Sequence, residues 1–199
     1  MTQAEGSHPA WSDGPPGRWE DGDVPTTVSL GEGTVVTGAD VFKRLRSHRN
    51  PALVIGSHCT MELTQFSYGL DGYIEIGDHC LFSNAVLMSE LEIRIGSHVV
   101  LGWNTYVADS DFHPLEPIAR IADTIACSPI GAAAGLPRPH VVCAPVVIED
   151  DVWVGPSCTI LKGVRIGAGA FVEPGSLVSI DVPARGRVMG NPARLVGNV

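Results

Sequence analysis

Large apolar residues recur along this chain at a fixed step of six. An amphipathic helix needs apolar residues spaced near 3.6, and a meandering antiparallel sheet has no fixed period. The step of six therefore predicts a coil of short strands separated by regular turns. The residues on this step are Ile76, Phe82 and Met88, then, after one extra residue, Ile95, Leu101 and Val107, and from Val142 onwards Ile148, Val154, Ile160, Ile166, Val172 and Val178.

A second position, four residues beyond the first, is usually small or β-branched, and glycine often follows the first position directly. Two inward side chains for every six residues fit short, flat faces joined by corners. Cys59, Cys80 and Cys158 occupy the small inward position, so we interpret them as packing residues, which is a common role of buried cysteine. His58, His79 and His98 fall in the turn phase, which places them at corners.

Three segments depart from the repeat and divide the chain into three parts. Residues 1–50 comprise an arm to about residue 27, which is rich in Pro, Gly and acidic residues and is expected to be poorly ordered. Residues 28–50 contain a basic stretch, Lys43-Arg44-Leu45-Arg46, and are predicted to form a short helix or an irregular first coil. Residues 51–183 form the coil, which an insertion at 108–141 interrupts, and residues 184–199 form a C-terminal tail. A long insertion in a regular scaffold usually carries function.

Composition and charge narrow the class of protein. The chain has 199 residues, of which 44% are hydrophobic, which is enough for one domain with a substantial core. Its net charge of −9 argues against nucleic-acid binding, which needs clustered Lys and Arg. We see neither a signal peptide nor a run of apolar residues long enough to span a membrane. A reduced, cytoplasmic protein without a membrane partner is therefore expected.

Three runs and the C-terminal GNPARLV resemble the hexapeptide-repeat acyltransferases, in particular the maltose and galactoside O-acetyltransferases and the xenobiotic acetyltransferases. The resemblance covers roughly residues 51–196 apart from the insertion. It implies an all-β fold, a left-handed parallel β-helix with an extruded loop, against the usual right-handed rule. It also implies a homotrimer that transfers an acetyl group from acetyl-CoA to a small-molecule acceptor. The runs are IEIGDHC, IRIGSHVVLGWNTYV and VVIEDDVWVGPSCTILKGVRIGAGAFVEPGSLVSIDVP.

The insertion carries the candidate catalytic base. Direct acyl transfer to a hydroxyl or amine needs a group that accepts a proton near pH 7, and histidine suits that task. His113 precedes Pro114, and an HP dipeptide in the same loop supplies the base in the sugar and antibiotic acetyltransferases that the chain resembles. Asp109 and Asp111 are near enough in sequence to orient its imidazole, although a backbone carbonyl often serves instead. A surface histidine without catalytic function is the alternative.

Further site residues follow from the resemblance. Asn84 matches a position near the reacting acyl group, and it would also fit an ordinary turn. Glu90 and Asp111 are expected to bind the acceptor, but only Glu90 remains of the acidic pair that some sugar acetyltransferases carry. The acceptor itself, and whether O- or N-acetylation occurs, stay open.

The resemblance assigns acetyl-CoA to the later coils, where the thin pantetheine arm lies along exposed backbone. Turn chemistry explains the Gly and Pro positions equally well. A local excess of cations in the C-terminal part favours an anionic ligand, although Ile180 stands where many relatives have Lys, so phosphate binding must rest on the arginines. The positions expected to bind acetyl-CoA are Trp153, Gly155, Pro156, Pro174, Ser179, Arg187 and Arg194.

Two functions of other classes remain open at this point. A repeat coil also makes a good assembly surface, so a non-catalytic scaffold is possible. The recurring histidines would suit a γ-class carbonic anhydrase, which places zinc on the same coil. We assign no metal ligand, because the histidines recur with the repeat itself and the HP loop is typical of acyltransferases.

Overall fold

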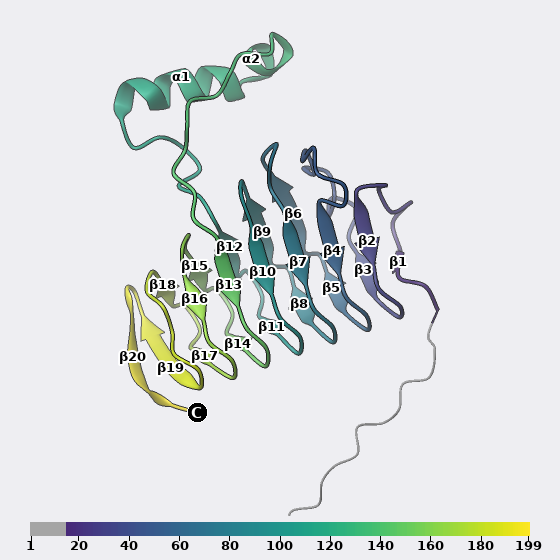
Figure 1. Cartoon of the computed structure of the whole chain (residues 1–199), viewed down its shortest axis with the longest axis vertical. Coiled ribbons are helices and arrows are strands. Elements are labelled where there is room, and N and C mark those ends of the chain that lie inside the picture. Colours follow the sequence, from purple (N-terminus) through teal and green to yellow (C-terminus); the bar gives the residue numbers. More distant parts are fainter. Residues whose placement is uncertain (1–14) are drawn as a thin grey trace, which may run out of the picture.

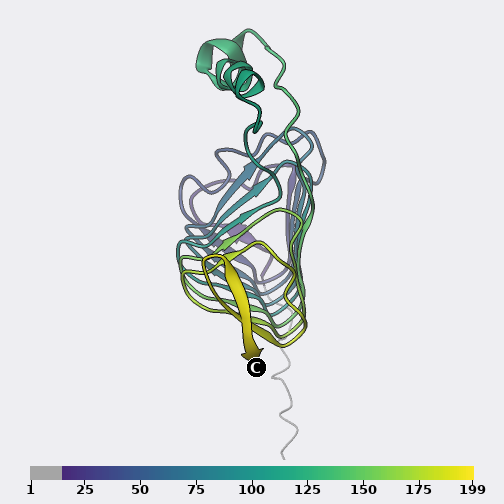
Figure 2. The ribbon, with the colours of Figure 1, turned by 90° about the vertical axis from the view of Figure 1, so that its left-hand side faces the viewer.

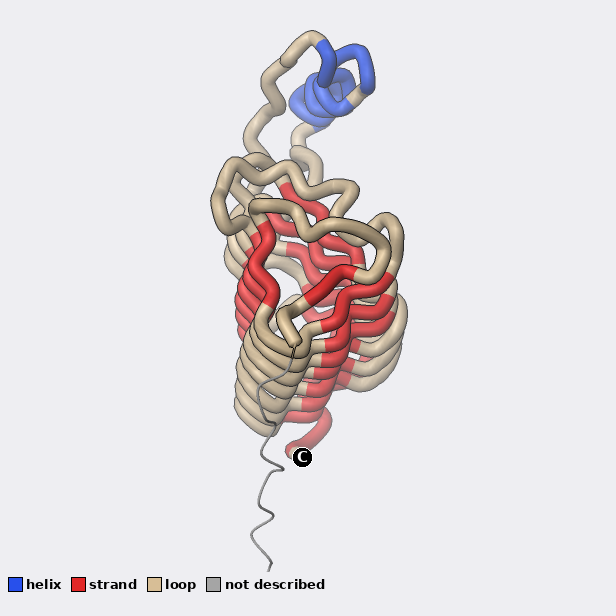
Figure 3. The backbone as a smooth tube through the Cα atoms, turned by 90° about the vertical axis from the view of Figure 1, so that its right-hand side faces the viewer, coloured by secondary structure: helices blue, strands red, loops and turns tan. Residues whose placement is uncertain are grey.

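The protein is a left-handed parallel β-helix, described by a computed structural model over residues 15–199. Three parallel sheets run along the coil, and successive strands of the chain enter successive sheets (Figure 1). The C-terminal and N-terminal ends of the stack are seen in Figures 2 and 3. This confirms the fold that the step of six and the family resemblance predicted.

The strands are short, and each sheet takes roughly every third one. The first sheet, in its spatial order, contains β1 (Arg18–Trp19), β3 (Val35–Thr37), β5 (Thr60–Glu62), β8 (Leu81–Ser83), β11 (Val100–Leu101), β14 (Trp153–Val154), β17 (Phe171–Val172), β19 (Gly186–Gly190) and β20 (Ala193–Asn198). The second contains β2 (Val28–Leu30), β4 (Leu53–Ile55), β7 (Ile74–Ile76), β10 (Ile93–Ile95), β13 (Val146–Ile148) and β16 (Arg165–Ile166). The third contains β6 (Gln65–Tyr68), β9 (Val86–Ser89), β12 (Tyr106–Ala108), β15 (Thr159–Ile160) and β18 (Leu177–Val178).

The core is a column of apolar side chains inside the coil. Phe82 pairs in register with Leu101, Leu101 with Val154, and Val154 with Val172, so equivalent residues of successive coils stack. All four are fully buried. Because every rung repeats this arrangement, the interior is continuous along the stack and holds the corners in fixed positions.

Two positions on the predicted step of six lie elsewhere. Met88 is only half-buried, and Leu87 takes the inward place, in register with Val107. The reason is a corner at Asn84 that is one residue shorter than the corner between Leu101 and Val107. Val142 is 53% exposed, because the chain re-enters the coil only at β13.

The N-terminal part of the described chain is joined to the coil rather than free. β1 pairs in parallel with β3, and β2 pairs in parallel with β4, so the stack begins before residue 51. Trp19 packs edge-on against Phe42, and its indole N–H donates to the carbonyl of Gly38. Residues 28–50 contain two strands and no helix. The arm expected over residues 1–27 falls partly outside the described residues, which exclude 1–14.

The C-terminal tail closes the other end of the stack. β19 continues the first sheet in parallel with β17, and β20 then folds back antiparallel on β19. The reversal places Arg194 opposite Met189 on the outside of the molecule.

Between β12 and β13 the chain leaves the coil and forms two helices that the sequence analysis did not predict. These are α1 (Pro117–Cys127) and α2 (Pro129–Ala133). They stand clear of the coil on two extended segments (Figures 1 and 2). Within residues 15–199, no helix is long and apolar enough to cross a membrane.

The recurring histidines and cysteines take the places that the repeat predicted. His58, His79 and His98 sit at corners with φ of 57°, 56° and 58°. Their rings stack with centroids 5.1 and 5.5 Å apart. Cys59, Cys80 and Cys158 are buried in the core.

Candidate active site

The base of the extruded loop is fastened to the coil where β12 ends. Ser110 and Cys143 form an isolated antiparallel bridge, so the outgoing and returning segments meet there. Asp111 accepts a hydrogen bond from Lys162 at 2.5 Å between Oδ1 and Nζ. Phe112 then turns the chain with a φ of 63°, and His113 follows. The direction in which His113 leaves the coil is therefore set by paired backbone and by an ion pair.

His113 contacts a carboxylate that comes from helix α1. Its Nδ1 lies 2.5 Å from Oδ2 of Asp123. The Asp123 side chain is fully buried, whereas the His113 side chain is 52% exposed. A carboxylate on Nδ1 holds the proton at that nitrogen and leaves Nε2 free to accept another. The pair therefore has the geometry of a histidine base oriented by an aspartate.

Arg138, on the returning segment of the loop, keeps Asp123 ionised. Its Nε donates to Oδ1 of Asp123 at 2.8 Å, on the opposite side of the carboxylate from His113. Burial raises the pKa of Asp123, but the hydrogen bonds from Arg138 and His113 outweigh burial, so that this pKa lies below its usual value. The same carboxylate raises the pKa of Arg138. Asp123 is thus a negative charge fixed between two donors.

Helix α1 begins in a way that fixes the His–Pro turn. Glu116 accepts a hydrogen bond from the backbone N–H of Ala119 at 2.6 Å and caps the helix, and Pro117 occupies its first turn. Arg120 donates to the carbonyls of Pro114 and Leu115 at 3.3 and 2.9 Å. These bonds tie the helix that carries Asp123 to the segment that carries His113.

Asp109 makes none of its hydrogen bonds with His113. Its buried carboxylate accepts from the Ser89 hydroxyl at 2.8 Å and from three successive backbone N–H groups, of Glu90, Leu91 and Glu92, at 2.7–2.9 Å. It therefore holds the corner that follows β9. The partner of His113 comes from ten residues further along the chain, which the sequence analysis did not foresee.

Glu90 and Asn84 lie at two different corners. Glu90 sits on the corner held by Asp109, and its Oε1 accepts from Arg138 at 3.2 Å, so it belongs to the same network as His113. Asn84 donates through Nδ2 to Oδ1 of Asn104 on the next coil at 2.6 Å. With a φ of 48°, Asn84 also has the left-handed backbone that Asn tolerates at turns.

The positions expected to bind acetyl-CoA gather on the C-terminal coils. Trp153 is in register with Phe171, which is in register with Arg187, along the outer face of β14, β17 and β19. The ring centroids of Trp153 and Phe171 are 4.6 Å apart, and the Arg187 guanidinium lies 5.9 Å from the Phe171 ring. Arg187 also donates to Glu173 at 2.6 Å. This face thus presents an aromatic and cationic strip.

Gly155, Pro156 and Pro174 form the corner beside this strip. A Cβ on Gly155 would lie 2.7 Å from the backbone nitrogen of Pro174, so the close stacking of successive coils requires glycine here. Packing against Pro174 thus accounts for this glycine, and its role in acetyl-CoA binding stays a prediction. Ser179 is exposed at a different corner, after β18, next to the exposed Ile180.

Most cations of the C-terminal part already have an acidic partner. Lys162 pairs with Asp111, Arg165 with Glu149 and Arg187 with Glu173. Arg185 donates instead to the carbonyl of Val199. Arg194 makes no ion pair with any residue in the range 15–199, so it is the most available cation of this set.

Both the sequence and the structure of this chain are similar to those of known proteins. Residues 145–179 match the family model described as bacterial transferase hexapeptide (six repeats). A solved hexapeptide-repeat containing acetyltransferase from Vibrio cholerae is 33% identical, over 70% of this chain and 69% of that one, with a TM-score of 0.54.

The chain belongs to the hexapeptide-repeat acyltransferase family.

Two further comparisons each match part of the chain. A structure of the same Vibrio cholerae protein complexed with acetyl coenzyme A is 34% identical, over 67% of this chain and 64% of that one, with a TM-score of 0.53. The 2,3,4,5-tetrahydropyridine-2,6-dicarboxylate N-acetyltransferase of Staphylococcus aureus strain JH9 is 51% identical over 53 residues. That match covers 27% of this chain and 22% of the relative.

The geometry also bears on the zinc alternative. Within residues 15–199, no three His, Cys, Asp or Glu side chains are grouped so that they could hold a metal ion. The three corner histidines stack ring on ring, and His98 forms an ion pair with Asp151 through Nδ1 at 3.2 Å.

Proposed function

We propose that this protein is an acetyltransferase that moves an acetyl group from acetyl-CoA to a hydroxyl or amine of a small molecule. The observation that carries the proposal is the His113–Asp123 pair on the extruded loop, with Nδ1 and Oδ2 2.5 Å apart. A non-catalytic scaffold needs neither a buried, ionised carboxylate behind a histidine nor an exposed imidazole in front of it. Family membership and the acetyl-CoA complex of the Vibrio cholerae relative support the same chemistry.

The reaction needs no covalent enzyme intermediate. The oxygen or nitrogen of the acceptor attacks the thioester carbonyl carbon with its lone pair, and Nε2 of His113 takes the proton that this atom loses. A backbone amide stabilises the tetrahedral oxyanion. The C–S bond then breaks, and the imidazolium returns the proton to the CoA thiolate. Asp123 keeps the imidazole in the productive tautomer and stabilises its positive charge.

For the donor, we propose the strip formed by Trp153 and Arg187 with the neighbouring corner at Gly155, Pro156 and Pro174. The pantetheine arm would lie along the exposed backbone there, with Ser179 contributing further along the coil. Arg194 is suited to bind the CoA phosphates because it makes no ion pair within the described residues. Arg187 is less available for the phosphates, because it already forms an ion pair with Glu173. Asn84 is proposed to orient the reacting groups.

We propose a homotrimer in which each active site lies between the β-helices of two neighbouring subunits. In one chain, no hydrogen bond or ion pair described for residues 15–199 joins the loop of His113 to the Trp153 strip. The loop projects from the end of β12, whereas the strip covers the outer face of β14 and β17 (Figure 1). The apolar side chains of α1 are also exposed, Ile118 at 77% and Ile121 at 60%, as a surface that packs on a neighbour would be.

The acceptor is a sugar, an antibiotic or another natural product. Glu90 and Asp111 are the acidic groups proposed to bind it, and Glu90 shares Arg138 with Asp123. We expect the protein in the cytoplasm, in keeping with the five cysteines, which are all free.

Calorimetric titration of CoA and acetyl-CoA tests this function, with wild type beside His113→Ala. We expect micromolar binding by both proteins and turnover by wild type alone, because His113 acts on the acceptor rather than holding the donor. The absence of binding at millimolar ligand, with circular dichroism unchanged, would overturn the proposal.

A further inference from the structure

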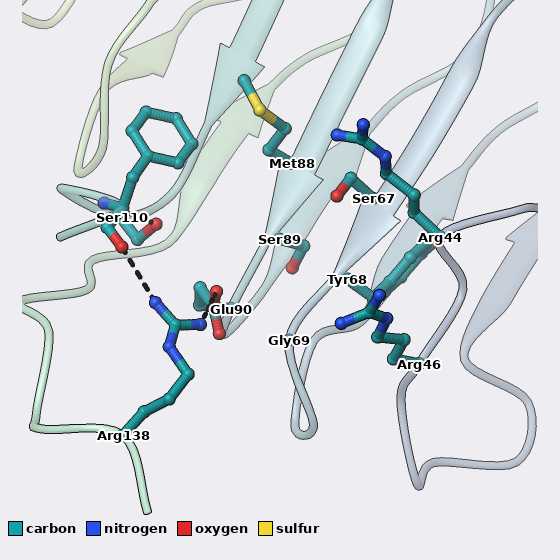
Figure 4. A pocket seen from close by; sticks show the side chains of 11 residues that line it. Arg44, Arg46, Ser67, Tyr68, Gly69, Met88, Ser89, Glu90, Ser110 and Arg138 are labelled. Carbon is teal, nitrogen blue, oxygen red and sulfur yellow. Dashed lines mark hydrogen bonds and ion pairs between the residues drawn. The ribbon is translucent and has the colours of Figure 1, made fainter. Parts of the chain in front are cut away.

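A polar cavity opens beside the base of the extruded loop. It has a volume of about 310 Å³ and lies between the 44–46 segment, the ends of β6 and β9, and the loop base (Figure 4). Arg44 and Arg46 line one side, and Glu90 and Arg138 line the other. Phe112 also belongs to the lining. The family resemblance assigns a role to only one of these residues, Glu90.

The cationic side of this cavity has no acidic partner. Arg44 and Arg46 make no ion pair with any residue in the described range 15–199. The neighbouring Lys43 differs, because its Nζ contacts Oδ1 of Asp40 at 3.0 Å. Across the cavity, the one carboxylate in the lining, Glu90, already bonds to Arg138. The cavity therefore holds three guanidinium groups against one carboxylate.

Tyr68 also belongs to the lining, but its hydroxyl is enclosed by the protein rather than open to the cavity. It is only 5% exposed, and its hydroxyl is buried without a hydrogen-bond partner among the described residues. A buried hydroxyl that lacks a partner is costly. Burial also raises the pKa of Tyr68, which keeps the proton on this hydroxyl.

The cavity is linked to the candidate base by one side chain. Arg138 donates to Asp123, which orients His113, and also to the carbonyl of Phe112 at 3.0 Å and to Glu90. A small molecule seated in the cavity would therefore contact Arg138, which bonds directly to the carboxylate that orients His113.

We infer that this cavity binds an oxyanion, a carboxylate or a phosphate, carried by the acceptor, with Arg44 and Arg46 as its ligands. The inference rests on the proposed acetyltransferase function, because it names the class of acceptor. Guanidinium groups bind carboxylate and phosphate through paired N–H donors, and a concave site concentrates their field. The protein as a whole carries a net charge of −9, which repels anions. Two neighbouring arginines without acidic partners therefore offer a local site where an anion can bind.

Binding of simple oxyanions provides the first test. Inorganic phosphate and succinate are titrated separately into the full chain at low ionic strength, and heat is recorded. We expect one of the two to bind in the millimolar range, and its identity tells phosphate from carboxylate. Arg44→Gln and Arg46→Gln should each weaken that binding at least fivefold.

Lys43→Gln is the matched control, since it removes the same charge from the same segment outside the cavity. It should change the affinity less than twofold. Failure of both oxyanions to bind would overturn the inference, and so would equal weakening by Lys43→Gln and Arg46→Gln. An increased Kd for acetyl-CoA in Arg44→Gln or Arg46→Gln would also overturn it, because the cavity would then hold the donor.

Turnover then tests the link to the acceptor. Primary amines and alcohols are assayed as acceptors with acetyl-CoA. Each neutral compound is compared with a derivative of the same compound that carries a phosphate or a carboxylate. We expect the charged member to have at least a tenfold higher kcat/KM, and Arg46→Gln to remove that preference through KM. Equal kcat/KM within pairs would overturn the inference while acetyl-CoA binding stands. Oxyanion binding without acetyl-CoA binding would instead overturn the proposed function.

Discussion

At the scale of single residues, catalysis is expected to depend on the second member of the His113–Asp123 pair. Asp123→Asn retains the shape but places an amide N–H group where Nδ1 needs an acceptor, so it favours the wrong tautomer. We expect kcat to fall by about 10²–10⁴-fold, with the Kd of acetyl-CoA unchanged, as measured by release of the CoA thiol.

Asp151→Asn is the matched control for this variant. Asp151 also contacts a histidine Nδ1, that of His98, but at an exposed corner of the coil. It should retain wild-type turnover. Equal activity of Asp123→Asn and wild type would mean that the aspartate does not orient the base.

The ionised state of Asp123 makes the loop sensitive to acid. Its pKa in the folded loop lies below its usual value, owing to the bonds from Arg138 and His113 against the effect of burial. The stabilisation is therefore complete above the unfolded value of about 3.9 and is lost as pH falls through the folded pKa. Amide exchange should show protection of residues 112–138 falling below about pH 4 in wild type, and much less dependence on pH in Asp123→Asn. A pH-independent wild-type loop would contradict this.

Only some residues of the network around His113 could be inferred from a sequence pattern. His113 could be proposed from the sequence because the HP dipeptide is a local pattern, and its catalytic role stays a prediction. Asp123 could not, because it reaches His113 only when α1 forms, and neighbours in sequence such as Asp109 seemed closer. The spacing of Ile118, Ile121 and Ile125 is the signal that would have indicated a helix. Arg138 returns from the far end of the loop, which no local pattern reveals.

At the scale of elements, helix α1 presents an apolar face that its own chain leaves exposed. Replacing Ile118 and Ile121 together with Asp should weaken a contact with a neighbouring subunit. We expect sedimentation velocity to show at least a tenfold loss of trimer affinity, with the coil still folded. Unchanged association in the double variant would mean that this face is not an interface.

The coil depends on its continuous interior. Phe82 is fully buried and stacks in register with Met61 and Leu101 on the coils to either side. Phe82→Ala should lower the free energy of unfolding by about 3–5 kcal/mol in denaturant titration. Leu70→Ala, at a side chain that is 56% exposed, should change it by less than about 0.5 kcal/mol. A small effect at Phe82 would argue against the stacked core.

The elements that the sequence predicted well are those that the repeat governs. Inward residues such as Leu101 and Val154 follow directly from the step of six, because each rung must bury the same two positions. Met88 did not follow, because a corner can lose a residue without breaking the stack, which shifts the phase locally. The corner at 89–92 is likewise irregular, and it is stabilised by Asp109 from the next coil.

At the scale of the whole molecule, the loop with His113 and the strip with Trp153 belong to different parts of the coil. The first projects beyond the stack on α1 and its connections (Figures 1 and 3), and the second lies on β14, β17 and β19 of the C-terminal coils. We therefore propose that a complete site forms only where the loop of one subunit meets the strip of the next.

Complementation between two inactive variants tests that claim most directly. His113→Ala is coexpressed with a variant that carries Trp153→Ala and Arg194→Ala, and the turnover of mixed trimers is measured. Each mixed trimer would contain one intact site in three, so random mixing should restore about a quarter of wild-type activity. Mixed trimers that stay as inactive as either parent would contradict a site shared between subunits.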